Sequence, residues 1–471
     1  MKIAAKVKGP SGTPLAGWFR LAFLVALLHG TGLRFAEAED VLTWNTNRNV
    51  VSADIKTSTL LEVLQRITES TGWHVYIEPS TFHTVSAKFK DEPPGEALHL
   101  LLGDVNYALL PGTNSSARLF VFRTSRENAT QPVQVAKTSE KPSKPKVIPN
   151  ELIVRLKPGT KIDDLARLLG AKVLGKIDGL NAYRLQFDDA SATTSARQEL
   201  SSNSDVASVE NNFVVDRPEI PQLVSADIPE PQLQLKPPTG TGRTVIGLVD
   251  TAVQPLGNNL DQFMQKQLSV VGDPSLDPNT PSHGTAMAET MLRTLQLLGN
   301  GSTSVQILPV DVYGSGESTS TFSVAQGIAL AINSGANPIN LSLGSSADSQ
   351  MVRDLIAEGV KQGISFYAAK GNSPDTNIQF PAGDPGATPV TAVDQQGQVM
   401  SWANRADLPA VGASGTVLVT YNHQTFVVQG TSPATAIVSS TAANLMAGGL
   451  SAANANAQIL KAPTPTTLPN K

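Results

Sequence analysis

The chain contains no cysteine among its 471 residues. This absence excludes disulfide frameworks, iron–sulfur clusters, zinc sites with thiolate ligands and thiol nucleophiles. If the protein is an enzyme, its reaction must therefore use oxygen or nitrogen chemistry. The stability of the folded chain must rest on packing.

Charge is also sparse. Charged residues make up 16% of the chain, and the formal net charge is −4. A chain with so little net charge has no long-range field that selects a polyanion, so we expect no nucleic acid partner. Residues 240–471 are the least charged part, with 9 Lys+Arg and 14 Asp+Glu. We expect this half to have the larger and drier interior, and to contain any catalytic domain.

No apolar run reaches the roughly 20 residues that a membrane helix needs. The run near the N-terminus is Leu21–Leu28, and the small residues of Ala36–Ala38 follow it. The basic residues before this run are Lys2, Lys6, Lys8 and Arg20. This pattern predicts a signal peptide over residues 1–38. We therefore expect an exported protein (periplasmic, cell-envelope or extracellular) whose mature chain has no transmembrane helix. An uncleaved anchor and an ordinary buried segment are the alternatives.

At roughly 150 residues per domain, the length predicts about three domains. Residues 45–125 show alternating strand and helix periodicities, which predict a small α+β domain. The segment Asp54–Lys56, followed by a leucine-rich helix and Ser70–Gly72, resembles the secretin and TonB short N-terminal domains. That resemblance implies an envelope protein partner for residues 45–125. A small α+β module without a partner is the alternative.

Three further segments complete the predicted organisation. Residues 126–149 contain four prolines and few apolar residues, which predicts a linker. Residues 150–217 have a βαββαβ pattern, typical of a second small α+β domain. Residues 218–460 are long enough for the large domain. Residues 461–471 are predicted to be a disordered tail.

Continuous apolar strands alternate with helices between residues 244 and 394. Strands are predicted at 245–249, 305–310, 339–343, 364–368 and 390–393, with helices near 284–297, 322–333 and 350–362. This alternation is typical of the α/β class, with a mostly parallel sheet that has helices on both faces. Functional residues in such sheets lie at the C-terminal ends of the strands.

Three polar residues stand at strand ends or helix starts. Asp250 ends its predicted strand, His283 opens a helix, and Ser432 opens a helix of small residues. Each one alone is explained as well by a turn or a helix cap. Together they have the order Asp, His, Ser, which differs from the Ser, Asp, His order of α/β-hydrolases. An esterase of that class is therefore disfavoured.

Five ordered motifs carry a resemblance to a known family. They are Val249-Asp250-Thr251, Ser282-His283-Gly284-Thr285, Asn340-Leu341-Ser342-Leu343-Gly344, Ala368-Ala369-Lys370-Gly371-Asn372-Ser373 and Gly430-Thr431-Ser432-Pro433-Ala434-Thr435. In this order and spacing they resemble the motifs of the subtilisin-like serine peptidases, the subtilases. The resemblance spans about residues 218–450. It implies a subtilisin-like α/β fold.

The resemblance also implies a role for each matched residue. Asp250, His283 and Ser432 would be the triad of a serine endopeptidase that hydrolyses peptide bonds through an acyl-enzyme intermediate. The side-chain amide of Asn372 would donate to the oxyanion. The residues expected to pair with the backbone of a peptide or protein substrate are Ser342, Leu343 and Gly344.

Residues 150–217 resemble subtilase propeptides, which implies a zymogen. The tail of this domain, between Asp216 and Gly242, would cross the active site and be cut. A permanently attached domain is the alternative. The family resemblance allows for calcium, but no loop has regularly spaced carboxylates. We therefore identify no metal site and predict no other cofactor.

Some residues depart from the family pattern. They are Ala252, Ala286, Glu289, Lys370, Pro433 and Ala436. Ala252 stands where a turn usually has glycine, and Ala286 replaces a second histidine. Lys370 adds a cation beside the oxyanion motif. None of these changes deletes a catalytic atom. The alternative that they raise is a catalytically impaired binding protein with the subtilase fold.

Overall fold

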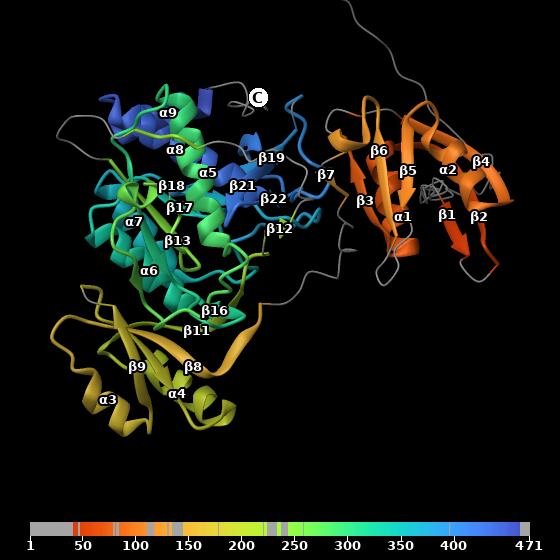
Figure 1. Cartoon of the computed structure of the whole chain (residues 1–471). Coiled ribbons are helices and arrows are strands. Elements are labelled where there is room, and N and C mark those ends of the chain that lie inside the picture. The colour runs from red at the N-terminus through yellow and green to blue at the C-terminus, as the bar shows by residue number, and fades with distance from the viewer. Residues whose placement is uncertain are drawn as a thin grey trace, which may run out of the picture.

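A computed structural model describes residues 41–461, apart from residues 46–47, 79–80, 82–83, 111–116, 130, 134–144, 178, 220, 224–232, 237–243, 258 and 395. The predicted signal peptide and nearly all of the predicted tail lie outside these residues, and both stay predictions. Figure 1 shows three regions that follow one another along the chain. Among the described residues, no helix combines the length and apolar content needed to cross a bilayer.

The first region is a module of two small sheets and two helices (Figure 1). One sheet is antiparallel and contains β1 (Val41–Asn45), β2 (Val50–Thr59) and β4 (Thr84–Glu92). The other has the order β5 (Asn106–Leu110), β6 (Arg118–Phe122), β3 (His74–Ile77) and β7 (Gln131–Pro132). The helices are α1 (Leu60–Thr71) and α2 (Pro94–Leu102). They pack on the sheets around a shared apolar core.

The ends of α1 follow from its sequence. The Thr59 side chain accepts from the backbone N–H of Glu62, and the Glu62 carboxylate accepts from the backbone N–H of Thr59 at 2.8 Å. This reciprocal pair satisfies two N–H groups that a helix start leaves unpaired. Gly72 ends the helix with a φ of 69°, a left-handed conformation that favours glycine.

Parts of the predicted linker, residues 126–149, form regular structure. Arg126–Asn128 form a 3-10 turn, and β7 pairs with β3 at the edge of the second sheet. Val133 is buried in the core of the module. Proline is tolerated in β7 because an edge strand needs no second row of ladder bonds.

The second region is a five-stranded sheet with two helices. Its elements are β8 (Val147–Leu156), α3 (Ile162–Leu168), β9 (Lys172–Ile177), β10 (Ala182–Gln186), α4 (Ala190–Ser202) and β11 (Val206–Asp216). The strand order is β16-β11-β8-β10-β9, in which β16 (Ser318–Ser320) belongs to the third region. The sequence pattern predicts a strand only over 206–209. The longer β11 exists because its last three residues pair with β16.

The third region confirms the expected parallel sheet with helices on both faces. Its seven strands have the order β14 (Leu268–Ser269), β15 (Gln306–Asp311), β13 (Val245–Asp250), β17 (Ile339–Leu341), β18 (Phe366–Ala369), β19 (Ala387–Val393) and β20 (Val411–Ser414). Every neighbouring pair is parallel. The helices are α5 (His283–Leu298), α6 (Thr321–Asn333), α7 (Gln350–Lys361), α8 (Thr431–Ala447) and α9 (Ala452–Lys461), and η2 is a 3-10 turn at Leu260–Phe263.

A smaller sheet lies beside this one. It contains β21 (Thr416–Tyr421), β22 (Gln424–Gln429) and the short strand β12 (Gln222–Leu223). The hairpin of β21 and β22 was not predicted, and it leads directly into α8.

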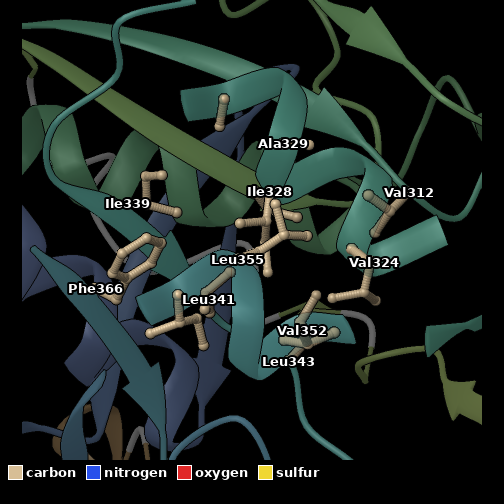
Figure 2. Close-up of a cluster of buried hydrophobic side chains, with 14 of the residues drawn as sticks. Val312, Val324, Ile328, Ala329, Ile339, Leu341, Leu343, Val352, Leu355 and Phe366 are labelled. Carbon is tan, nitrogen blue, oxygen red and sulfur yellow. The ribbon is translucent and has the colours of Figure 1, made fainter. Parts of the chain in front are cut away.

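Two apolar cores lie on opposite faces of the parallel sheet. Helices α6 and α7 cover one face, where Ile328, Leu355 and Phe366 pack together (Figure 2). Helices α5 and α8 cover the other face. Burying each such large side chain contributes roughly 1.5–3 kcal/mol. These cores hold the strand ends and the helix starts from which the candidate site is built.

Candidate active site

Asp250 is the last residue of β13 and has no solvent exposure. Parallel neighbours β15 and β17 flank this strand, so the carboxylate leaves the sheet at its C-terminal edge. Its Oδ1 accepts from the backbone N–H of Thr251 at 2.6 Å. The strand end thus holds a buried carboxylate in a fixed position.

His283 is the first residue of α5. Ser282 caps the helix, accepting from the backbone N–H of Thr285 at 3.0 Å. The His283 Nδ1 lies 2.8 Å from Asp250 Oδ1 and 2.9 Å from Asp250 Oδ2. The next residue has to be glycine, because a Cβ on Gly284 would lie 2.1 Å from the Thr251 carbonyl oxygen. This close approach of the start of α5 to Thr251 places the His283 imidazole beside the Asp250 carboxylate.

Ser432 is the second residue of α8 and is 8% exposed. Its Oγ donates to the backbone carbonyl of Ser342 at 3.3 Å. Among the described residues, the hydroxyl makes no hydrogen bond to His283. Both residues line the same pocket, and catalytic hydrogen bonds often tighten only when the substrate is bound.

One pocket brings the candidate residues together. Its lining residues are Pro218, Glu219, Pro221, Gln222, His283, Asn372, Val427, Val428, Gln429 and Ser432. The first four belong to the segment that follows β11. The pocket thus holds three of the four predicted catalytic and oxyanion residues against the chain that leaves the second region. Asp250 lies behind His283.

Asn372 is exposed, and its side chain is fixed from behind. Its Oδ1 accepts from the backbone N–H of Thr431 at 2.8 Å and from Thr431 Oγ1 at 3.0 Å. Thr431 Oγ1 also accepts from the backbone N–H of Gly371 at 3.1 Å. With its oxygen held in this way, the amide Nδ2 remains as a donor.

Ser342, Leu343 and Gly344 come directly after β17. Ser342 is 1% exposed, and its Oγ donates to the Ser432 carbonyl at 3.1 Å. Leu343 packs in the first core of the sheet. These contacts tie the predicted substrate-pairing segment to the start of α8.

The residues that depart from the family pattern pack or form hydrogen bonds inside the fold. Ala252 is fully buried without a positive φ, so its Cβ is accommodated. Glu289 is 3% exposed, and its carboxylate accepts from the backbone N–H of Thr420 at 2.7 Å and from Arg293. It therefore joins α5 to β21. Ala286, Pro433 and Ala436 are buried in the region of α5 and α8.

Lys370 also has a structural environment. Its Nζ donates to the carbonyl of Ala406 at 2.8 Å and to that of Leu408 at 3.0 Å. Burial lowers the pKa of Lys370. The cation thus holds the loop after β19 to the strand that leads into the oxyanion motif.

Two residues of the site carry no predicted role. Thr431 positions Asn372, although the sequence shows it only as part of the serine motif. Asp311, at the end of β15, pairs in register with Asp250 and is fully buried. In the sequence, Asp311 could have been found as a carboxylate that directly follows a predicted strand. Within the described part of the chain, no group of three or more His, Asp or Glu side chains could hold a metal ion.

Comparison with known proteins identifies the relatives of both the second and the third region. A family model described as "Subtilase family" matches residues 241–467, and a model described as "Fervidolysin N-terminal prodomain" matches residues 133–212. Subtilisin Savinase of Lederbergia lenta is 31% identical over 215 residues, which cover 44% of this chain and 76% of that protein. An alkaline protease of Shouchella clausii is 31% identical over 215 residues, which cover 44% of this chain and 54% of that protein.

The solved structure of fervidolysin from Fervidobacterium pennivorans, a keratinolytic enzyme related to subtilisin, has a TM-score of 0.51 and 17% identity. The likeness covers 67% of this chain and 57% of that chain, and it concerns the fold. The chain thus spans little more than half the length of fervidolysin and of the alkaline protease. The expected subtilisin-like α/β fold and propeptide-like second region are confirmed. The chain therefore belongs to the subtilase family of serine proteases and carries a prodomain of the fervidolysin type.

Proposed function

We propose that the chain is an exported serine endopeptidase, made as a zymogen, with Asp250, His283 and Ser432 as its triad. The observation that carries this proposal is the contact of His283 Nδ1 with both carboxylate oxygens of Asp250, in a pocket shared with Ser432 and Asn372. A buried carboxylate on one ring nitrogen fixes the tautomer that leaves the other nitrogen as a base.

The chemistry follows from this arrangement. His283 Nε2 takes the proton of Ser432 as the hydroxyl oxygen attacks the scissile carbonyl, and Asp250 stabilises the imidazolium. The tetrahedral oxyanion accepts from Asn372 Nδ2 and from the backbone N–H of Ser432 at the helix start. The protonated His283 then donates to the leaving amine, which gives the acyl-enzyme. Water hydrolyses this intermediate by the reverse sequence.

The zymogen proposal is supported by the path of the prodomain tail. Strand β11 pairs with β16 up to Asp216, and the backbone N–H of Arg217 donates to the Glu317 carbonyl at 3.1 Å. The next residues line the pocket of His283 and Ser432, and β12 then pairs antiparallel with β22. A chain that lines the pocket of His283 and Ser432 blocks substrates until it is cut, between Asp216 and Gly242.

A fluorophosphonate probe tests the triad. It reacts with an activated serine, so the purified, processed wild-type protein should be labelled, and Ser432→Ala should not. Ser439→Ala, which removes another buried hydroxyl of α8, is the matched control and should retain labelling. A folded, processed wild-type protein that is never labelled would contradict the proposal and favour a catalytically impaired binding protein.

Export and an envelope partner complete the proposal. Export rests on the predicted signal peptide, and the partner rests on the resemblance of residues 45–125 to secretin and TonB short N-terminal domains. N-terminal sequencing of Ser432→Ala recovered outside the cytoplasm tests export, because this variant cannot cut its own prodomain. Cleavage after Ala38 is the expected result, and a cytoplasmic protein that starts at Met1 would contradict it.

A further inference from the structure

We propose that the active-site cleft contains a subsite that selects an arginine side chain on the N-terminal side of the scissile bond. The cation subsite consists of Tyr313, Gly314, Gly316 and the buried carboxylate of Asp311. Its use in substrate selection rests on the proposed peptidase function. Its existence as a guanidinium site rests on the contacts of Arg217.

Arg217 occupies the cation subsite in the uncut chain. Its Nη1 donates to the Gly316 carbonyl and, at 3.4 Å, to the Gly314 carbonyl. Its Nη2 also donates to the Gly314 carbonyl at 3.4 Å. The guanidinium carbon lies 5.8 Å from the centroid of the Tyr313 ring, within the range of a cation–π contact. Carbonyl oxygens and an aromatic face together recognise a planar cation.

Asp311 supplies negative charge beneath this loop. It is fully buried, and its Oδ1 accepts from the backbone N–H groups of Tyr313 at 2.9 Å and Gly314 at 3.0 Å. Its Oδ2 is buried without a hydrogen-bond partner in the described structure. Burial raises the pKa of Asp311, and the charge of Arg217 opposes that rise. A nearby cation therefore compensates a carboxylate that is otherwise costly to bury.

The backbone places Arg217 where a substrate residue would lie. Its N–H donates to Glu317 as a continuation of the pairing between β11 and β16. The next residue, Pro218, already lines the pocket with His283 and Ser432. A substrate chain that takes the same path puts a side chain into the cation subsite on the N-terminal side of the residues that lie in this pocket.

The geometry favours arginine over lysine. Two nitrogens of the guanidinium bond to the loop while its plane approaches the tyrosine ring, and an ammonium has one nitrogen for the same acceptors. We expect kcat/KM for peptides with arginine at this position to exceed that for norleucine by about tenfold or more. Lysine should fall between the two.

The first experiment measures this ratio on the protease processed from the wild-type chain and from Asp311→Asn. Asparagine keeps an acceptor for the two loop N–H groups and removes the charge. Taking the arginine-to-norleucine ratio cancels any effect of the substitution on catalysis itself. The ratio should fall several-fold in Asp311→Asn. An equal ratio in both proteins, or a wild-type ratio near one, would overturn the proposal.

The second experiment needs no activity. Hydrogen exchange of β11 and β16 is measured in full-length Ser432→Ala, where Arg217→Ala should speed exchange and Arg217→Lys should do so less. With Asp311→Asn added, Arg217→Ala should lose part of its effect. Arg155→Ala, which removes an ion pair of 2.7 Å to Asp354 elsewhere in the prodomain interface, is the matched control and should keep its full effect.

The two experiments separate the subsite from the peptidase function. If no peptide is cleaved and no probe is bound, the proposed function fails, and the exchange measurement still decides whether the subsite binds a guanidinium. If peptides are cleaved without a preference for arginine, the peptidase function stands and the subsite proposal fails. Unchanged exchange in Arg217→Ala also contradicts the proposal.

Discussion

At the scale of single residues, the orientation of Asn372, the proposed oxyanion donor, depends on Thr431. Its backbone N–H and Oγ1 hold the Asn372 oxygen, and its Oγ1 also accepts from Gly371. The Asn372 amide has an oxygen that accepts and a nitrogen that donates hydrogen bonds. The nitrogen faces the pocket only while the oxygen is bonded elsewhere. Thr431 is therefore a positioning residue for Asn372.

Replacing Thr431 by valine removes the two hydrogen bonds of Oγ1, of which the bond to Asn372 orients the amide. It should lower kcat by about tenfold, with KM nearly unchanged, because one neutral hydrogen bond contributes roughly 0.5–1.5 kcal/mol. The loss falls on the transition state, where the oxyanion forms. Steady-state kinetics with a peptide substrate measures both constants. Thr431→Ser should restore kcat, and Thr441→Val in the same helix should leave it unchanged. A rise in KM alone would contradict the positioning role.

The residue types at the site could be predicted, but their mutual contacts could not. Asp250 and His283 stand at a strand end and a helix start, which the pattern places in the crevice of the sheet. Nothing in the pattern indicates that Ser432 donates to Ser342, or that Lys370 bonds to a loop 36 positions later. Such contacts depend on loop conformation, which has no periodic signal.

At the scale of elements, strand β11 docks the prodomain onto the ends of two helices. Glu210 accepts from the backbone N–H groups of Gln350 at 2.7 Å and Met351 at 3.1 Å, at the start of α7. Asn212 accepts from the backbone N–H of Phe322 at 3.1 Å, at the start of α6. Unpaired N–H groups and the helix dipole make helix starts favourable for such acceptors.

The docking through Glu210 should depend on pH. Burial raises the pKa of Glu210 above its usual value while the prodomain is docked. The docked state thus binds the proton more tightly than the separated state, in which the pKa is ordinary. The contribution of Glu210 should therefore weaken as pH rises from the ordinary pKa through the raised one, and stay constant above it.

Hydrogen exchange of β11 in Ser432→Ala tests this dependence. It is measured over this pH range and corrected for intrinsic exchange. Glu210→Gln, which does not titrate, is the control and should remove the difference in protection between the lower and upper ends of the range. If protection in the parent protein increases with pH across the range, and Glu210→Gln abolishes that increase, the assigned sign is wrong.

The elements that the sequence predicts well are those with their own periodicity. Five strands of the parallel sheet (β13, β15, β17, β18 and β19) and the helices α5, α6 and α7 match the predicted positions within a few residues, whereas β14 and β20 are not predicted. The missed or shortened elements take their regularity from a partner. Strand β11 is extended by β16, β12 exists by pairing with β22, and β7 exists by pairing with β3. Pairing with a distant segment leaves no local pattern.

At the scale of the whole molecule, the apolar cores show which regions depend on one another. Ile153, Ile177 and Val215 of the prodomain belong to the same core as Phe322 and Leu355 of the third region. The core of the N-terminal module contains residues of that module alone. Its contact with the third region includes a 3.5 Å hydrogen bond from Gln65 to Ser401. We therefore expect the prodomain to unfold with the peptidase region and the module to unfold separately.

Two substitutions that each create a cavity test this expectation in full-length Ser432→Ala. Ile153→Ala and Leu119→Ala each truncate a buried side chain, at a cost of roughly 2–5 kcal/mol. Ile153→Ala should lower the unfolding temperature of the transition that includes the parallel sheet. Leu119→Ala should lower only that of the module. In the chain that keeps Ser432, removal of residues 41–133, with residues 1–40 kept, should leave probe labelling and prodomain processing within about twofold, because distant and independent sites contribute additively. A Leu119→Ala protein that unfolds in one shifted transition, or a truncated chain that is no longer labelled, would show that the module and the peptidase region are coupled.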